Sequence, residues 1–171
     1  MKHGITLIEL LIVIALVGVI TGVGWPALQG WNCKQEHRND YEALNNLFEK
    51  ARAEASSEGN SSLVRANRGL PSNGGTYTVY SLQTKNCSFS GSPTNLSFKI
   101  KSLTIPNDTK IYGPAWQCFH ADGSASASQA LNLHQVQKEC DGKTTTYQTL
   151  IFGATGLFEK KIRKGSSWQD L

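Results

Sequence analysis

The sequence predicts an α+β protein in which a long N-terminal α-helical spine packs on an antiparallel β-rich head. The first reason is a steep gradient of polarity. Glu9 is the only ionisable side chain between Ile5 and Val23, whereas the rest of the chain is rich in Ser, Thr, Asn and Gly. The second reason is a change of pattern at Gly59, where helical spacing of apolar residues gives way to short strand candidates separated by turns.

The apolar run is long enough to cross a membrane. At a rise of about 1.5 Å per residue, residues 5–23 cover roughly 28 Å of helix. Lys2 precedes the run, so the positive-inside bias predicts a single pass with a cytoplasmic N-terminus and the bulk of the chain on the far side of the membrane. A cleaved secretory signal fits poorly, because the run continues into Gly24-Trp25-Pro26 and not into a small-residue cleavage site. A plain anchor leaves Glu9 unexplained, since a carboxylate in hydrocarbon costs about 2.5–3.5 kcal/mol.

A third interpretation accounts for this glutamate. Residues 4–10 read Gly-Ile-Thr-Leu-Ile-Glu-Leu and closely resemble the type III signal of type IV prepilins. The resemblance implies that residues 1–4 are a leader, which the prepilin peptidase/methyltransferase removes after Gly4 before it methylates Ile5. It also implies that Glu9 neutralises the terminal amine of a neighbouring subunit during filament assembly. Mature chains of this family usually begin with Phe, and Ile5 departs from that pattern.

The resemblance extends along the helical spine. It implies that the helix loosens or kinks at Gly18 and Pro26, because a proline removes one helical hydrogen bond and clashes with the preceding turn. Beyond Pro26, one helix face is formed at spacings of three and four by Cys33, His37, Tyr41, Leu44, Phe48, Ala51 and Ala55. We therefore expect a transmembrane half at residues 5–28 and an amphipathic half at residues 29–58, ended by Gly59.

The remaining residues, 59–171, are predicted to form the head. Strand candidates separated by turn signals lie at 77–82, 96–100, 110–112, 116–119, 144–152 and 157–162. The turn signals lie at 71–75, 90–93, 122–123 and 141–142. These candidates indicate an antiparallel structure of one or two sheets packed over the amphipathic helix.

Three parts of the chain are similar to the GspH/FimT-like minor pilins. They are the helix-to-strand junction at 51–55 and 62–64, the strand and turn at 118–125, and the hairpin at 151–157. The resemblance implies a minor pilin that helps to initiate or cap a type IV pilus. The alternative is a minor pseudopilin of the type II secretion pseudopilus. Such proteins catalyse no reaction. Their partners are other pilins or pseudopilins and the inner-membrane assembly platform. The resemblance also implies a single pass through the inner membrane with a periplasmic head, and later a place in the filament, at the cell surface if that filament is a pilus.

The four cysteines favour an oxidising compartment, because they lie in a polar, turn-rich sequence. Four cysteines allow three pairings, and the sequence leaves them open. Cys118 and Cys140 flank a loop that could close on itself. Cys33, on the helix face directed at the head, could pair with Cys87. Each bridge would stabilise the head by about 2–4 kcal/mol.

Metal binding and catalysis have little support in the sequence. A zinc site would have to be built from Cys118, His120, His134 and Cys140. Their spacing fits no common finger pattern. His120 and Asp122 could be drawn into an acid–base pair, but no activated nucleophile accompanies them. We therefore expect no metal, no cofactor and no catalytic residue.

A basic cluster near the C-terminus raises a third possibility, a pilus-tip DNA receptor for natural transformation. It consists of Lys160, Lys161, Arg163 and Lys164. Some FimT-like pilins bind DNA through basic C-terminal residues, but this sequence lacks the Gly-Arg-x-Arg string associated with that activity. The formal charge of +4 falls to +3 when Lys2 leaves with the leader, since 16 basic residues then face 13 acidic ones. A solvated edge strand, whose lysines deter edge-to-edge pairing, is the favoured interpretation.

Overall fold

The computed structural model describes residues 6–67, 72–82, 84–85, 87, 96–126 and 131–171. The chain divides into two compact units, residues 1–36 and residues 37–171. One helix, α1 (Leu7–Glu58), supplies the first unit and the beginning of the second. In the described part of the chain, eight strands follow the helix and form one antiparallel sheet. We call residues 37–171 the head unit.

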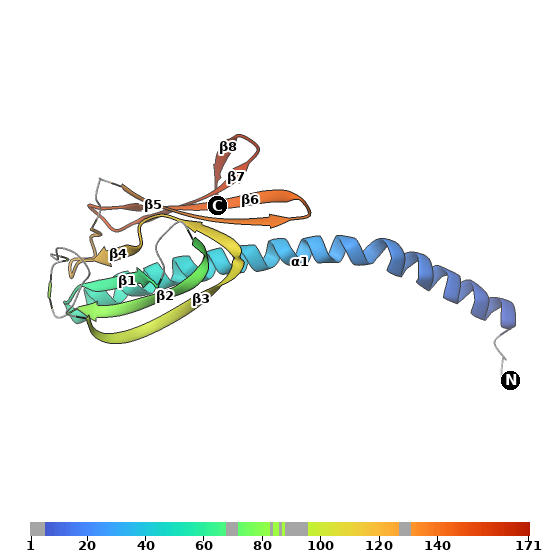
Figure 1. The fold of residues 1–171 in the computed structure, drawn as a ribbon, viewed down its shortest axis with the longest axis horizontal. Helices are drawn as coiled ribbons and strands as arrows, with labels where there is room; N and C mark the ends of the chain where they lie inside the picture. Colours follow the sequence, from blue (N-terminus) through green and yellow to red (C-terminus); the bar gives the residue numbers. More distant parts are fainter. Residues whose placement is uncertain (1–5, 68–71, 83, 86, 88–95, 127–130) are drawn as a thin grey trace. The chain divides into compact units, whose positions relative to one another are not determined.

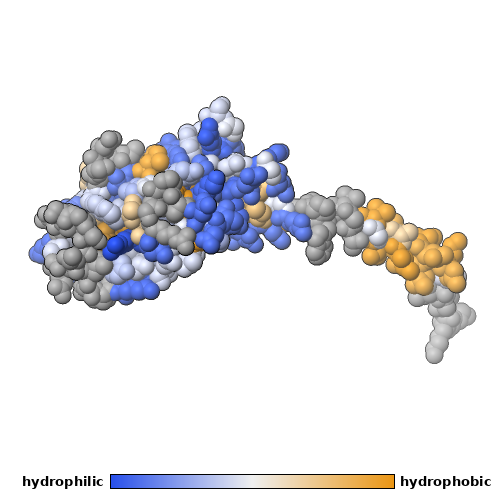
Figure 2. Space-filling view, viewed as in Figure 1, coloured by the Kyte–Doolittle hydropathy of each residue, from blue (hydrophilic) through white to orange (hydrophobic). Residues whose placement is uncertain are grey.

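The part of α1 in the first unit exposes apolar side chains on all sides. Every large apolar side chain described from Leu7 to Val19 is more than half exposed, and Figure 2 shows them in orange. Successive residues point to different sides of a helix, so this segment has no continuous polar stripe. The helix continues without interruption through Gly18 and Pro26. Among the described residues, no helix combines the length and hydropathy that would make it a candidate membrane span.

The strands of the head unit pair only with antiparallel neighbours. Their bounds are β1 (Ser62–Ala66), β2 (Ser72–Leu82), β3 (Leu96–Tyr112), β4 (Trp116–Phe119), β5 (Leu131–Cys140), β6 (Lys143–Phe152), β7 (Phe158–Lys164) and β8 (Ser167–Asp170). Their order across the sheet is β4-β1-β2-β3-β5-β6-β7-β8. Figure 1 shows β1, β2 and β3 grouped in one half of the sheet, and β5 to β8 in the other.

Strand β3 connects the two halves of the sheet. Its residues 96–105, together with 110 and 111, pair with β2 on one side, and its last four residues, 109–112, pair with β5 on the other. The strand candidates at 96–100 and 110–112 are therefore the two ends of one 17-residue strand. The sequence locates both ends correctly and misses their continuity.

A β-bulge stands where the sequence predicts a turn at 71–75. Within the described residues this stretch belongs to β2, and its register with β3 shifts across Gly74. Gly74 has a φ of 60°, and a Cβ atom on it would lie 2.5 Å from the carbonyl oxygen of Pro106. Glycine is required both by the left-handed backbone and by this close approach. The predicted turn is therefore wrong, and its glycines serve the bulge.

The core lies between α1 and one face of the sheet. The predicted helix face is buried from its second member onward, at no more than 2% exposure, through His37, Tyr41, Leu44, Phe48, Ala51 and Ala55. Its apolar members pack with strand residues that include Val64, Val79, Ile105, Ile111, Phe119, Val136, Tyr147 and Ile151. Each large apolar side chain buried in this way contributes about 1.5–3 kcal/mol. The predicted packing of an amphipathic helix on a β-rich head is confirmed.

The sequence does not predict β5 and β8. The buried side of β5 carries Asn132, His134, Val136, Lys138 and Cys140. This side is mostly polar, and the outward Leu133 is 39% exposed, so the usual apolar-in, polar-out alternation is too weak to identify the strand. Strand β8 has four residues, all exposed. The predicted turns at 122–123 and 141–142 are confirmed, and the signal at 90–93 lies outside the described residues.

Candidate functional site

The prepilin-like segment begins α1 with a capping box. The Glu9 N–H donates to the Thr6 hydroxyl at 3.3 Å, and the Thr6 N–H donates to the Glu9 carboxylate at 3.3 Å. The pair thereby satisfies backbone donors that have no helical partner in the first turn. The carboxylate also lies at the positive end of the helix dipole. Gly4 and Ile5 lie outside the described residues, so cleavage and methylation there stay predictions.

Arg52 joins the helix to two turns of the sheet. Its Nε donates to the carbonyl oxygen of Gly123 at 3.1 Å, and its Nη2 donates to the carbonyl oxygen of Thr155 at 3.1 Å. Gly123 follows β4, and Thr155 lies in the turn between β6 and β7. The three stretches that resemble minor pilins therefore meet at one place. We call it the Arg52 joint, formed by Arg52, Gly123, Thr155 and Gly156.

Two glycines allow the turns of the Arg52 joint to touch. Gly123 and Gly156 have φ values of 81° and 62°, in the left-handed region. A Cβ atom on Gly156 would overlap the carbonyl oxygen of Gly123 and would lie 3.1 Å from Nε of Arg52. A side chain at this position would therefore push the two turns apart and disturb the arginine between them.

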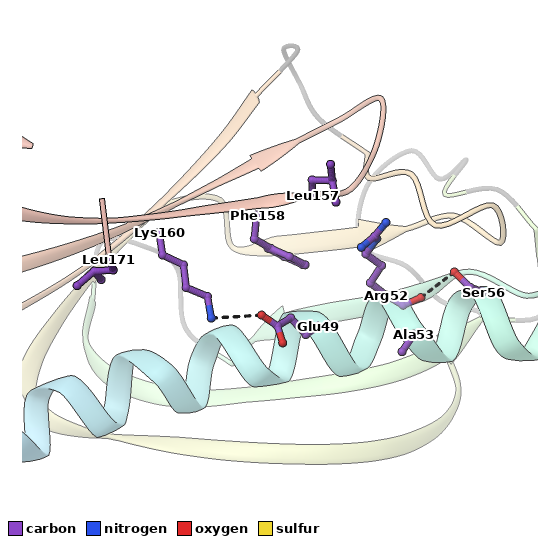
Figure 3. A pocket seen from close by; sticks show the side chains of 8 residues that line it. All are labelled: Glu49, Arg52, Ala53, Ser56, Leu157, Phe158, Lys160 and Leu171. Carbon is purple, nitrogen blue, oxygen red and sulfur yellow. Dashed lines mark hydrogen bonds and ion pairs between the residues drawn. The ribbon is translucent and has the colours of Figure 1, made fainter. Parts of the chain in front are cut away.

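A groove of about 710 Å³ lies beside the Arg52 joint, between α1 and β7 (Figure 3). It is lined by Glu49, Arg52, Ala53, Ser56, Leu157, Phe158, Lys160 and Leu171. The two leucines of this lining, Leu157 and Leu171, are 53% and 51% exposed. The groove thus combines apolar side chains that water still reaches with charged groups supplied by the helix and by β7.

Ion pairs neutralise half of the basic cluster near the C-terminus. Nζ of Lys160 lies 3.4 Å from a carboxylate oxygen of Glu42 and 3.3 Å from one of Glu49, both on α1. Nζ of Lys161 lies 2.8 Å from a carboxylate oxygen of Glu159. The other two basic residues of the cluster are exposed, and neither forms an ion pair within the described chain. The cluster is a weaker source of positive potential than its sequence indicates.

The disulfide in the head unit differs from both pairings considered from the sequence. Cys87 bonds to Cys118, at a separation of 31 residues. Cys118 therefore does not close a loop with Cys140, and Cys87 does not hold Cys33. The pairing follows from the sheet order, because β4 pairs with β1 beside β2, whose end leads to Cys87. Among the described residues no cysteine is a free thiol.

The residues of the hypothetical zinc site serve other purposes. Cys118 is oxidised, and Nδ1 of His120 accepts the backbone N–H of Cys87 at 3.1 Å, which supports the disulfide. The ring of His134 packs on Phe48, with centroids 4.7 Å apart. Within the described residues no three metal-ligating side chains gather.

Asp122 stabilises its own turn. Its carboxylate accepts hydrogen bonds from the N–H and hydroxyl of Ser124, at 2.9 and 2.6 Å. These bonds lower the pKa of the carboxyl group. In the acid–base pair considered from the sequence, each residue therefore has a different hydrogen-bond partner. His120 binds the backbone of Cys87 at the disulfide, and Asp122 binds Ser124 in the turn.

Two histidines are buried in the head unit. Nε2 of His37 lies 3.1 Å from the carbonyl oxygen of Thr145, while neither ring nitrogen of His134 has a hydrogen-bond partner in the described chain. Burial lowers the pKa of each histidine to about 4, because the charged ring would lose its hydration. Both rings are therefore neutral at pH 7. The helical spacing identifies His37 as inward, but no signal identifies His134, since its strand is not predicted.

Comparison with known proteins agrees with the sequence motif and the fold. Residues 1–25 match the prokaryotic N-terminal methylation motif. The structure is similar to the type IV minor pilin FimU of Pseudomonas aeruginosa strain PAO1 in space group P21, with a TM-score of 0.56 and 16% identity over 80% of this chain and 94% of that chain. The structure of the same protein in space group P65 gives a TM-score of 0.52 and 16% identity, over 77% of this chain and 96% of that chain. No curated protein sequence matches the chain.

The chain therefore carries a prepilin methylation motif and has a minor pilin fold. These findings confirm the predicted resemblance to type IV pilin-like proteins and the predicted α+β fold. The sequence identity of 16% limits the structural comparison to the fold.

Proposed function

We propose that the chain is a minor pilin that helps to initiate or cap a type IV pilus. The observation that carries this proposal is the order of two features, a prepilin methylation motif followed by a head with a minor pilin fold. A helix that is apolar on every side requires apolar surroundings on every side. The exposed apolar segment from Leu7 to Val19 supports anchorage in the inner membrane before assembly and burial among neighbouring helices afterwards.

The proposal assigns two successive environments to Glu9. In the free chain its carboxylate caps the first turn of its own helix together with Thr6. After cleavage behind Gly4 and methylation of Ile5, the same carboxylate pairs with the terminal amine of the next subunit in the filament. The capping box holds the carboxylate at the helix end where that pairing takes place, so little reorientation is needed.

A minor pseudopilin of type II secretion is the alternative. The similarity to a protein described as a type IV minor pilin favours the pilus. The DNA-receptor hypothesis is not favoured, because Lys160 and Lys161 already pair with carboxylates. Phosphate binding would have to compete with those pairs.

The test is complementation in the organism's own cells after deletion of the gene. The full-length wild type should restore filaments. The Glu9→Ala variant should reach the membrane fraction but should restore only few filaments. Glu58→Ala is the matched control, because it removes an exposed carboxylate from the other end of the same helix. Filaments are counted by electron microscopy and by immunoblotting of sheared material.

Secretion of type II substrates is measured in the same strains. Loss of secretion with normal filaments would reject the pilus assignment and favour a minor pseudopilin of type II secretion. Normal filaments and normal secretion after the deletion would reject both assignments.

A further inference from the structure

The groove between α1 and β7 contains one cation without a carboxylate partner. Arg52 uses two of its N–H groups on backbone carbonyls, and no ion pair to it exists within the described chain. A guanidinium has five N–H donors, so three remain. Glu49, the acidic residue of the groove, is already engaged by Lys160 at 3.3 Å. The lining side chains sum to +1, and Glu42, 3.4 Å from Lys160, brings the charge of the groove and its ion-pair partners to zero. Arg52 is the groove cation that has no carboxylate partner among the described residues.

This cation has a fixed orientation. The two carbonyls of the Arg52 joint hold the guanidinium from one side, and the turn that supplies the Thr155 carbonyl continues directly into Leu157. Figure 3 shows Arg52 and Leu157 at the same end of the groove, with Phe158 beside them. The Arg52 guanidinium and the exposed Leu157 side chain are therefore both held in place by the same turn. This lowers the conformational entropy that is lost when a partner binds.

We propose that this groove receives an acidic–apolar segment of a neighbouring filament subunit, whose carboxylate pairs with Arg52 and whose large apolar side chain packs on Leu157. The proposal rests on the proposed filament function. A planar guanidinium binds a carboxylate through two parallel hydrogen bonds. Arginine and large apolar side chains are typical of the energetically important centre of protein interfaces. The guanidinium of Arg52, which contacts only carbonyls in the described chain, favours a partner that carries a carboxylate over one that carries a cation.

The groove is also of suitable size. Its volume of about 710 Å³ lies within the range of about 300–1,000 Å³ that binding pockets occupy. Leu157, which is 53% exposed, would lose water from its surface when the partner's apolar side chain packs on it. Burial of Leu157 and pairing of the charge on Arg52 would take place in one step, because both lie at the same end of the groove.

Site-specific photocrosslinking in intact cells tests the proposal. The full-length chain carries the photoreactive residue p-benzoylphenylalanine in place of Ala53, an exposed groove residue, or in place of Asn46, an exposed control on the same helix outside the groove. The expected result is a crosslink from position 53, and none from position 46, to another pilin. The captured peptide should contain Asp or Glu next to a large apolar residue.

Charge variants then test the recognition. Leu157→Glu should lower the crosslink yield about tenfold, because the introduced carboxylate would compete with the partner's carboxylate for Arg52 and remove an apolar contact, and Leu157→Gln should lower it less. Leu133→Glu is the matched control, since it alters a leucine that is 39% exposed and lies outside the groove. Equal yields for Leu157→Glu and Leu133→Glu would overturn the proposal.

The amount of the chain in sheared filaments distinguishes a failure of the groove proposal from a failure of the proposed filament function. If the chain is present in sheared filaments but position 53 gives no pilin crosslink, the groove proposal is rejected and the filament role stands. A crosslink from position 53 to lipid only would also reject it. If the chain is absent from filaments altogether, the proposed function fails and this proposal fails with it.

Discussion

Two glycines with the same backbone conformation provide a direct test of the Arg52 joint. Gly156 and Gly165 have φ values of 62° and 63°. They differ in their surroundings, because a Cβ atom on Gly156 would overlap the carbonyl oxygen of Gly123, whereas one on Gly165 would meet nothing within 4 Å. Gly156→Ala and Gly165→Ala therefore share the cost of a left-handed alanine and differ in the steric contact alone.

The expected magnitudes follow from these contacts. A left-handed alanine costs about 1–2 kcal/mol, offset in part by about 0.4–1 kcal/mol because alanine restricts the unfolded chain. Gly165→Ala should therefore lower the free energy of unfolding by about 1 kcal/mol. Gly156→Ala adds about 1–3 kcal/mol of steric strain against backbone. It adds about 1 kcal/mol more if the hydrogen bond from Arg52 to Gly123 is lost.

The measurement is thermal and urea unfolding of the full-length protein in detergent, followed by circular dichroism. The difference of about 1–4 kcal/mol corresponds to a melting temperature roughly 2–16 °C lower for Gly156→Ala than for Gly165→Ala. Equal losses in the two variants would refute the reasoning, since they would show that the turns do not touch at Gly156.

Three further predictions concern processing, pH and nucleic acid. The intact mass of the membrane form should show loss of residues 1–4 and one added methyl group on Ile5, and a mature chain that retains the leader would contradict the prepilin assignment. For His134 the unfolded pKa of 6.5 exceeds the folded pKa of about 4, so the unfolded state binds more protons between these values. Stability is therefore complete above about pH 6.5 and falls toward pH 4 by up to about 1.4 kcal/mol per pH unit, and His134→Phe should flatten this dependence in urea titrations. The full-length protein should show no salt-sensitive DNA binding at about 0.15 M salt. Binding that is lost when Arg163 and Lys164 are replaced by Ala would contradict this expectation.

The sequence predicts the helix–sheet packing well because the signal is local. Residues three and four apart share a helix face whatever the rest of the chain does, so the buried face from His37 to Ala55 follows from spacing alone. The strands whose inward residues are apolar can also be predicted from the sequence, because their alternation is a local pattern as well. In β5 the inward side includes Asn132 and Lys138, and no rule of alternation identifies such a strand.

The remaining features depend on residues far apart in the sequence. Arg52 bonds to carbonyls 71 and 103 residues further along the chain. The Cys87–Cys118 bond requires β4 to lie beside β1, which the order of strands along the chain does not indicate. The groove is likewise assembled from α1, a turn, β7 and Leu171. Local patterns identify each of these parts separately and say nothing about which parts become neighbours.

The division of the sheet at β3 and β5 has a mechanical consequence. The two halves share only four register pairs, from Thr109–Lys138 to Tyr112–Gln135, whereas β5 and β6 share ten. Of the ladders between inner strands in the described chain this is the shortest, and the two outermost ladders, β1 with β4 and β7 with β8, are equally short. Arg52 holds one turn from each side of this ladder, after β4 and before β7. Pulling the two halves apart would therefore also require the hydrogen bonds of Arg52 to Gly123 and Thr155 to break.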